Sequence, residues 1–65
     1  MSNPILEAIA KEQQKLIRQE SARDATKALI DVLGKEPREV NKLARQEDAI
    51  TETKSRIAKL NKAVK

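Results

Sequence analysis

Glycine and proline, the residues that interrupt helices, occur only three times in this chain and leave two long segments that contain neither. The sequence contains a single glycine, Gly34, and two prolines, Pro4 and Pro37. The strong helix formers Ala, Lys, Glu, Gln, Leu and Arg dominate the segments between them. Proline suits the first turn of a helix, where its missing N–H costs no hydrogen bond. Glycine suits a left-handed residue just past a helix end, so the pattern predicts a helix, a turn and a second helix.

The two predicted helices cover about 4–33 and about 37–64, with a turn at 34–36. Asn3 stands directly before the first proline and can cap the first helix. Each helix would be about 40–45 Å long at 1.5 Å per residue. Because a short link makes long helices antiparallel neighbours, the expected fold class is all-α. We therefore expect one αα-hairpin domain spanning 1–65, packed with partner chains as a helical bundle or coiled coil.

A seven-residue repeat marks one side of the second helix. Its aliphatic members are Leu43, Ile50, Ile57 and Val64. The other position of the same heptad is held by Gln46, Thr53 and Leu60. Strict seven-residue spacing favours a left-handed coiled coil, and polar residues at such positions often fix register at a cost in stability. The alternative is a simple apolar stripe that faces any neighbouring helix.

The first helix shows two apolar faces instead of one. At 100° per residue, one side holds Ile5, Leu6, Ile9, Leu16 and Ile17. A largely different side holds Ala22, Ala25, Ala28, Leu29, Val32 and Leu33. One explanation is that the apolar surface winds around the helix, because the helix contacts both the second helix of its own hairpin and another subunit. The other is that the helix bends or breaks at 19–21. We favour the winding surface, because no Gly or Pro marks a break.

Folding about the turn brings apolar residues of the two helices together. The expected pairs are Leu29 with Leu43, Ala22 with Ile50, Leu16 with Ile57, and Ile9 with Val64. Without aromatic residues or cysteines, a lone monomer has a small core and no disulfide, so self-association or docking onto a larger partner is expected. The candidate packing and oligomer-interface residues are Ile5, Ile9, Leu16, Leu29, Leu43, Ile50, Ile57, Leu60 and Val64.

The net charge of +4 arises in the second half of the chain. Residues 1–33 hold five basic and five acidic side chains, whereas residues 34–65 hold nine basic and five acidic ones. The cations after the last acidic residue are Lys54, Arg56, Lys59, Lys62 and Lys65. Their ordinary explanation is solubility and a favourable interaction with the helix dipole. The functional alternative is contact with an acidic partner or with nucleic-acid phosphates.

The residue types that the chain lacks exclude many activities. It has no His, Cys or aromatic residue, and hence no thiol nucleophile, imidazole base, zinc-finger ligand set or base-stacking platform. A single glycine cannot form a phosphate loop. The carboxylate pairs Glu36/Glu39 and Glu47/Asp48 have no facing partner that would make a catalytic dyad or a metal site. No apolar run could span a membrane, and no signal peptide is evident. We expect no enzyme, cofactor, metal, small-molecule substrate or membrane association.

A helix-turn-helix with helices at 38–46 and 51–64 is an alternative arrangement of the second half of the chain. It fits poorly, because the turn position that favours glycine would hold Asp48 or Ala49. The seven-residue repeat also continues through the proposed turn.

The leading functional hypothesis is a non-enzymatic structural, assembly or interaction protein. It would be a small helical component of a homo-oligomer or a larger complex, and a virion or accessory protein of a virus or phage is one form of this hypothesis. The alternative is a small basic dimeric regulator that places the five C-terminal cations on nucleic-acid phosphates. A third is an inhibitor that caps another protein. The expected location is the cytoplasm, or the virion in the viral form.

Overall fold

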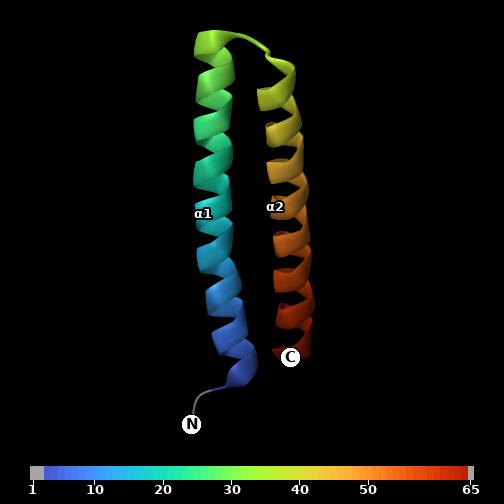
Figure 1. Ribbon diagram of the computed structural model, residues 1–65. Coiled ribbons are helices and arrows are strands. Elements are labelled where there is room, and N and C mark those ends of the chain that lie inside the picture. The colour runs from blue at the N-terminus through green and yellow to red at the C-terminus, as the bar shows by residue number, and fades with distance from the viewer. Residues whose placement is uncertain (1–2, 65) are drawn as a thin grey trace.

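A computed structural model of the protein describes residues 3–64 as two helices and a turn. Helix α1 is Pro4–Leu33 and helix α2 is Pro37–Val64. The helices lie side by side along most of their length, and the start of α1 lies at the same end of the molecule as the end of α2 (Figure 1). The helix boundaries and the helical hairpin predicted from the sequence are confirmed. No helix within 3–64 is long and apolar enough to cross a membrane.

Local hydrogen bonds explain where α1 begins and ends. Asn3 is the N-cap, and its Oδ1 accepts a hydrogen bond from the Ile5 amide at 2.9 Å. At the other end, the Gly34 amide donates to the Ile30 carbonyl at 2.8 Å. Gly34 has φ 90° and ψ 174°, so φ is positive as predicted, but ψ lies far from the value of about 47° that a left-handed helical residue has. The chain must leave α1 at once, because only Lys35 and Glu36 separate Gly34 from α2.

Helix α1 is unbroken through the polar stretch 18–21. A break at this point is therefore wrong, whereas a bend of the helix stays a prediction. The two apolar faces predicted for the first helix lie on one continuous helix, as expected where no Gly or Pro interrupts it.

Buried and half-buried side chains on both helices follow a heptad spacing. On α1 they include Ile5, Ile9, Glu12, Leu16, Gln19, Arg23, Thr26 and Ile30. On α2 they include Glu39, Leu43, Gln46, Ile50, Thr53, Ile57 and Leu60. We call these two sets the seam. The stripe predicted on the second helix thus faces α1, including its polar positions Gln46 and Thr53, with the exception of Val64, which is exposed.

The seam contains little buried apolar surface. Among the large aliphatic residues of 3–64, only Ile9 and Ile50 are buried, with 7% and 2% of their surface exposed. The other buried residues are Thr26 and Thr53, at 2% and 1%. Two threonines therefore occupy positions that aliphatic residues would fill in a typical hairpin core.

The α1 side of the seam differs from the expected pairing near the turn. Ala22 and Leu29, predicted to face Ile50 and Leu43, are exposed. Polar Thr26 is buried instead, because its hydroxyl is satisfied within its own helix by donating to the Ala22 carbonyl at 3.2 Å. The small size of Thr26 and its satisfied hydroxyl allow it to pack against α2 at a position between the predicted contacts Ala22 and Leu29.

Candidate interaction surfaces

A polar contact joins the two helices at the middle of the seam. The Thr53 hydroxyl donates to Gln19 Oε1 at 2.8 Å, and the same hydroxyl lies 3.0 Å from the Ala49 carbonyl of its own helix. Thr53 is almost fully buried, so this bond is shielded from water. The bond also fixes how the two helices align along their length, because it holds Gln19 of α1 opposite Thr53 of α2.

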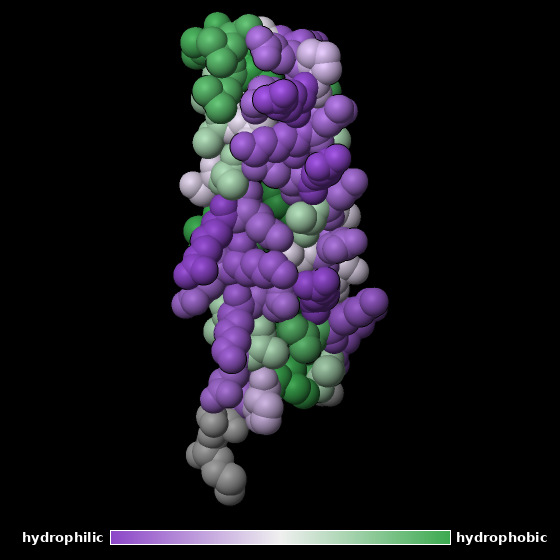
Figure 2. All heavy atoms as spheres, in the orientation of Figure 1, coloured by the Kyte–Doolittle hydropathy of each residue, from purple (hydrophilic) through white to green (hydrophobic). Residues whose placement is uncertain are grey.

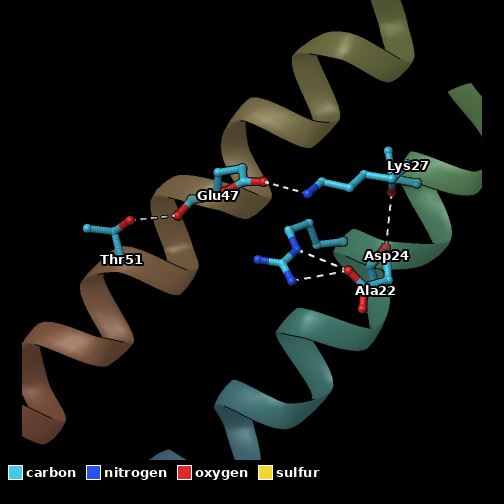
Figure 3. A network of polar contacts seen from close by, with 7 residues as sticks. Ala22, Asp24, Lys27, Glu47 and Thr51 are labelled. Carbon is cyan, nitrogen blue, oxygen red and sulfur yellow. Dashed lines mark hydrogen bonds and ion pairs between the residues drawn. The ribbon is translucent and has the colours of Figure 1, made fainter.

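Ion pairs between the helices lie at the edges of the seam. Lys27 and Glu47 reach toward one another from α1 and α2, with Nζ and Oε1 3.8 Å apart (Figure 3). Arg56 Nη1 lies 3.9 Å from Glu12 Oε1 on α1, and Arg56 Nη2 lies 4.0 Å from Glu52 Oε2 within α2 itself. Because both members of the first pair and Arg56 of the second are about half exposed, each pair contributes at most about 1 kcal/mol.

Some polar seam atoms have no partner. Within residues 3–64, Glu12 Oε2, Glu39 Oε2 and Gln46 Oε1 are buried without a hydrogen bond. Leaving a buried acceptor unpaired costs free energy. The seam therefore specifies how the helices pair but stabilises the isolated hairpin weakly.

Apolar side chains instead gather on the outside of α1 near the turn. The members of this group are exposed, and we call them the α1 apolar face: Ala22, Ala25, Leu29, Val32 and Leu33. At 100° per residue the face is centred about a quarter turn from the seam. Val32 is 80% exposed and Leu29 is 44% exposed. Hydrophobic surface accordingly gathers over α1 at the turn end of the molecule, whereas hydrophilic atoms cover much of α2 (Figure 2).

The nine predicted packing residues divide between the seam and the surface. Ile9 and Ile50 are buried, and Leu29 and Val64 are exposed. The five half-buried members all belong to the seam: Ile5, Leu16, Leu43, Ile57 and Leu60. The structure thus assembles seven of the nine along the helix–helix contact and leaves two on the outside.

The predicted C-terminal cations do not form one surface. Arg56 contacts Glu12 and Glu52 at the edge of the seam, and Lys54 lies about 160° around the helix from it. Lys59 and Lys62 are exposed, and Lys65 lies outside the described residues. The four described cations therefore provide no single face on which a partner could bind all of them.

A second basic cluster, not singled out from the sequence, lies on the first turns of α2. Arg38, Asn41, Lys42 and Arg45 are exposed and line a shallow groove of about 340 Å³. The sequence signal is their spacing at i, i+3, i+4 and i+7, which places them on one side of a helix. We call these four residues the basic groove.

No group of carboxylates within residues 3–64 is arranged to hold a metal ion. Comparison with known proteins finds no matching family model, no matching curated protein and no matching solved structure. The functional argument therefore depends on the surfaces described above.

Proposed function

We propose that this chain is a non-enzymatic assembly protein whose antiparallel hairpins pair with a second copy through the α1 apolar face. The observation that carries this proposal is that more of the large aliphatic side chains are exposed than buried. Two large aliphatic residues of 3–64 are buried, whereas seven are exposed: Leu6, Ile17, Leu29, Val32, Leu33, Val40 and Val64. A chain this short needs a further source of stability, and oligomerisation is a common one.

The composition of the α1 apolar face suits pairing with itself. None of its five side chains is charged, so two copies meet there without bringing like charges together. The small side chains of Ala22 and Ala25 let two helices approach closely, and the larger Leu29 and Val32 extend toward the neighbouring helix. A two-fold pair uses the same patch on both subunits, which an uncharged face of this kind allows.

Pairing at this face would convert two hairpins into a four-helix bundle. Each α1 would then contact two helices, its own α2 through the seam and a partner helix through the apolar face. This arrangement accounts for the two apolar faces of α1, which one hairpin cannot cover. It also brings Leu29, one of the two predicted packing residues that lie outside the seam, into an interface.

Thermal unfolding at several protein concentrations tests the proposal. If folding is coupled to pairing, the Tm of the wild-type protein rises with protein concentration. Val32→Glu places a charge on the α1 apolar face, and we expect it to lower the Tm and weaken this concentration dependence. The matched control is Ile17→Glu, which places the same charge at an exposed aliphatic residue about 22 Å farther along α1 than Val32 and about 110° around the helix from the centre of the face.

The two variants distinguish pairing at this face from general loss of apolar surface. Ile17→Glu should keep the concentration dependence of the wild-type protein. A wild-type Tm independent of concentration, or an equal effect of the two substitutions, contradicts pairing through the α1 apolar face. A wild-type chain without helical structure at every concentration also contradicts it and points to a different protein as the partner.

A further inference from the structure

The basic groove of α2 presents cations that the protein itself does not neutralise. Within residues 3–64, no carboxylate oxygen lies within 4.0 Å of a charged nitrogen of Arg38, Lys42 or Arg45. All three are exposed, and Asn41 lies beside them, between Arg38 and Lys42 along the helix axis, with an amide that can donate hydrogen bonds. By contrast, the exposed Arg56 farther along α2 pairs with Glu12 and Glu52.

These cations form a line along the helix. At 100° per residue, Arg38, Lys42 and Arg45 fall within an arc of about 60°. At 1.5 Å per residue, they follow one another along the axis by about 6 Å and about 4.5 Å. Lys54, Lys59 and Lys62 spread over an arc more than twice as wide. The groove is thus the more compact basic surface of the described chain.

We propose that the basic groove binds the phosphate backbone of a nucleic-acid duplex. A nucleic-acid strand carries a regular line of phosphates that a line of cations on a helix can follow. Two of the three cations are arginines, whose planar guanidinium donates two parallel hydrogen bonds to one phosphate. Lys42 adds a compact charge between them, and the Asn41 amide is a suitable donor to a phosphate or sugar oxygen.

The composition of the chain favours a duplex over a single strand or a membrane. Proteins that bind single strands stack bases on aromatic side chains, and this chain has none. Helices that bind membrane surfaces typically insert Trp or Phe, which are also absent. Binding through phosphates alone is independent of base sequence and weakens steeply as salt increases.

The test measures the binding of the full-length protein to a fluorescent DNA duplex by anisotropy at several salt concentrations. A duplex of about 20 base pairs is longer than the 50 Å molecule. The groove variant combines Arg38→Gln, Lys42→Gln and Arg45→Gln. The matched control combines Lys54→Gln, Lys59→Gln and Lys62→Gln, which removes the same net charge from the other end of α2. Circular dichroism verifies that each variant keeps the wild-type helix content.

We expect the groove variant to lose at least about tenfold in affinity and about 2 to 3 from the slope of log K against log salt, since each phosphate contact contributes about 0.9. The control should lose less than half of that slope. Duplexes of unrelated sequence should bind the wild-type protein equally.

Four results overturn the proposal. The first is no binding of the wild-type protein to duplex DNA, including the case in which it binds anionic lipid vesicles instead. The second is an equal loss in the groove and control variants, which would show a response to net charge alone. The third is a strong preference for one duplex sequence, and the fourth is competition by polyglutamate as effective as competition by unlabelled DNA, which would indicate an acidic protein partner.

Discussion

Thr53 and Gln19 connect the two helices at the middle of the seam through a hydrogen bond of 2.8 Å. Thr53 has 1% of its surface exposed and is the most buried residue of the described chain, so a polar contact occupies the best-shielded position of the hairpin. Polar contacts between helices fix register at a cost in stability, because an apolar pair at the same place would gain more from burial. This relationship explains how a hairpin with so small an apolar core still has a defined alignment of its helices.

Replacing Thr53 tests this bond. Thr53→Val keeps the shape of the side chain but removes the hydroxyl, and Gln19 loses its donor. We expect unfolding free energy to fall by about 1 kcal/mol, measured by urea unfolding followed by circular dichroism. The matched control is Thr51→Val. Thr51 makes the same kind of bond to the carbonyl four residues before it, at 3.0 Å to Glu47, but it is exposed and has no partner on α1. A loss as large for Thr51→Val as for Thr53→Val would show that the contact with Gln19 contributes nothing.

Ile50 is the most buried aliphatic residue of 3–64, and its truncation should have the largest effect of any single change in the seam. Ile50→Ala removes buried methyl groups and leaves a cavity, so we expect a loss of about 2–5 kcal/mol in unfolding free energy. In a domain of this size such a loss unfolds much of the population. Ile17→Ala makes the same chemical change at a residue that is 66% exposed, and should cost less than about 0.5 kcal/mol. Similar Tm values for the two variants would contradict the placement of Ile50 at the centre of the seam.

Gly34 adopts a backbone conformation that L-amino acids with side chains avoid. At φ 90° and ψ 174°, a side chain adds strain of about 1–3 kcal/mol, even though a Cβ there would meet no atom within 4 Å. Gly34→Ala should therefore lower the unfolding free energy by about that amount. A synthetic chain with D-alanine at position 34 is the control, because a D-residue prefers positive φ, and it should be at least as stable as the wild-type protein. Equal stability of the L-Ala and D-Ala forms would contradict this conformation of the turn.

Asn3 stabilises the start of α1 through its side chain. Asn3→Ala removes the acceptor for the Ile5 amide, and the expected loss is about 0.5–2 kcal/mol in unfolding free energy. Asn3→Asp keeps an acceptor at the same place and adds a negative charge near the positive end of the helix dipole, so it should match or exceed the stability of the wild-type protein. An unchanged Tm for Asn3→Ala would show that α1 does not depend on this cap.

Prediction from the sequence succeeds where single residues have strong local effects. Pro4, Gly34 and Pro37 define both helices, because proline and glycine restrict the backbone independently of the rest of the chain. The heptad on α2 is equally visible, since aliphatic residues hold most of its positions. Both features depend on short-range rules that need no knowledge of the partner helix.

The seam residues of α1 could not be predicted from the sequence, for a physical reason. Its seven-residue spacing continues through Glu12, Gln19, Arg23 and Thr26, and a search for apolar residues finds only Ile5, Ile9, Leu16 and Ile30. Partners on α2 or in the same helix satisfy the polar groups of Gln19 and Thr26, whereas Glu12 pairs with Arg56 through Oε1 and leaves Oε2 without a partner. Which polar residues find such partners depends on the paired structure. The same limit explains why Leu29 was expected to face Leu43 while it lies on the exposed α1 apolar face.

The solution mass of the wild-type protein tests the central claim most directly. Size-exclusion chromatography with light scattering gives this mass, and refractive index serves as the concentration signal because the chain has no Trp or Tyr. Pairing through the α1 apolar face predicts a helical species with twice the 7.3 kDa mass of the chain. A helical species of 7.3 kDa at every concentration would contradict it, because the exposed aliphatic residues of α1 would then have no second copy to cover them.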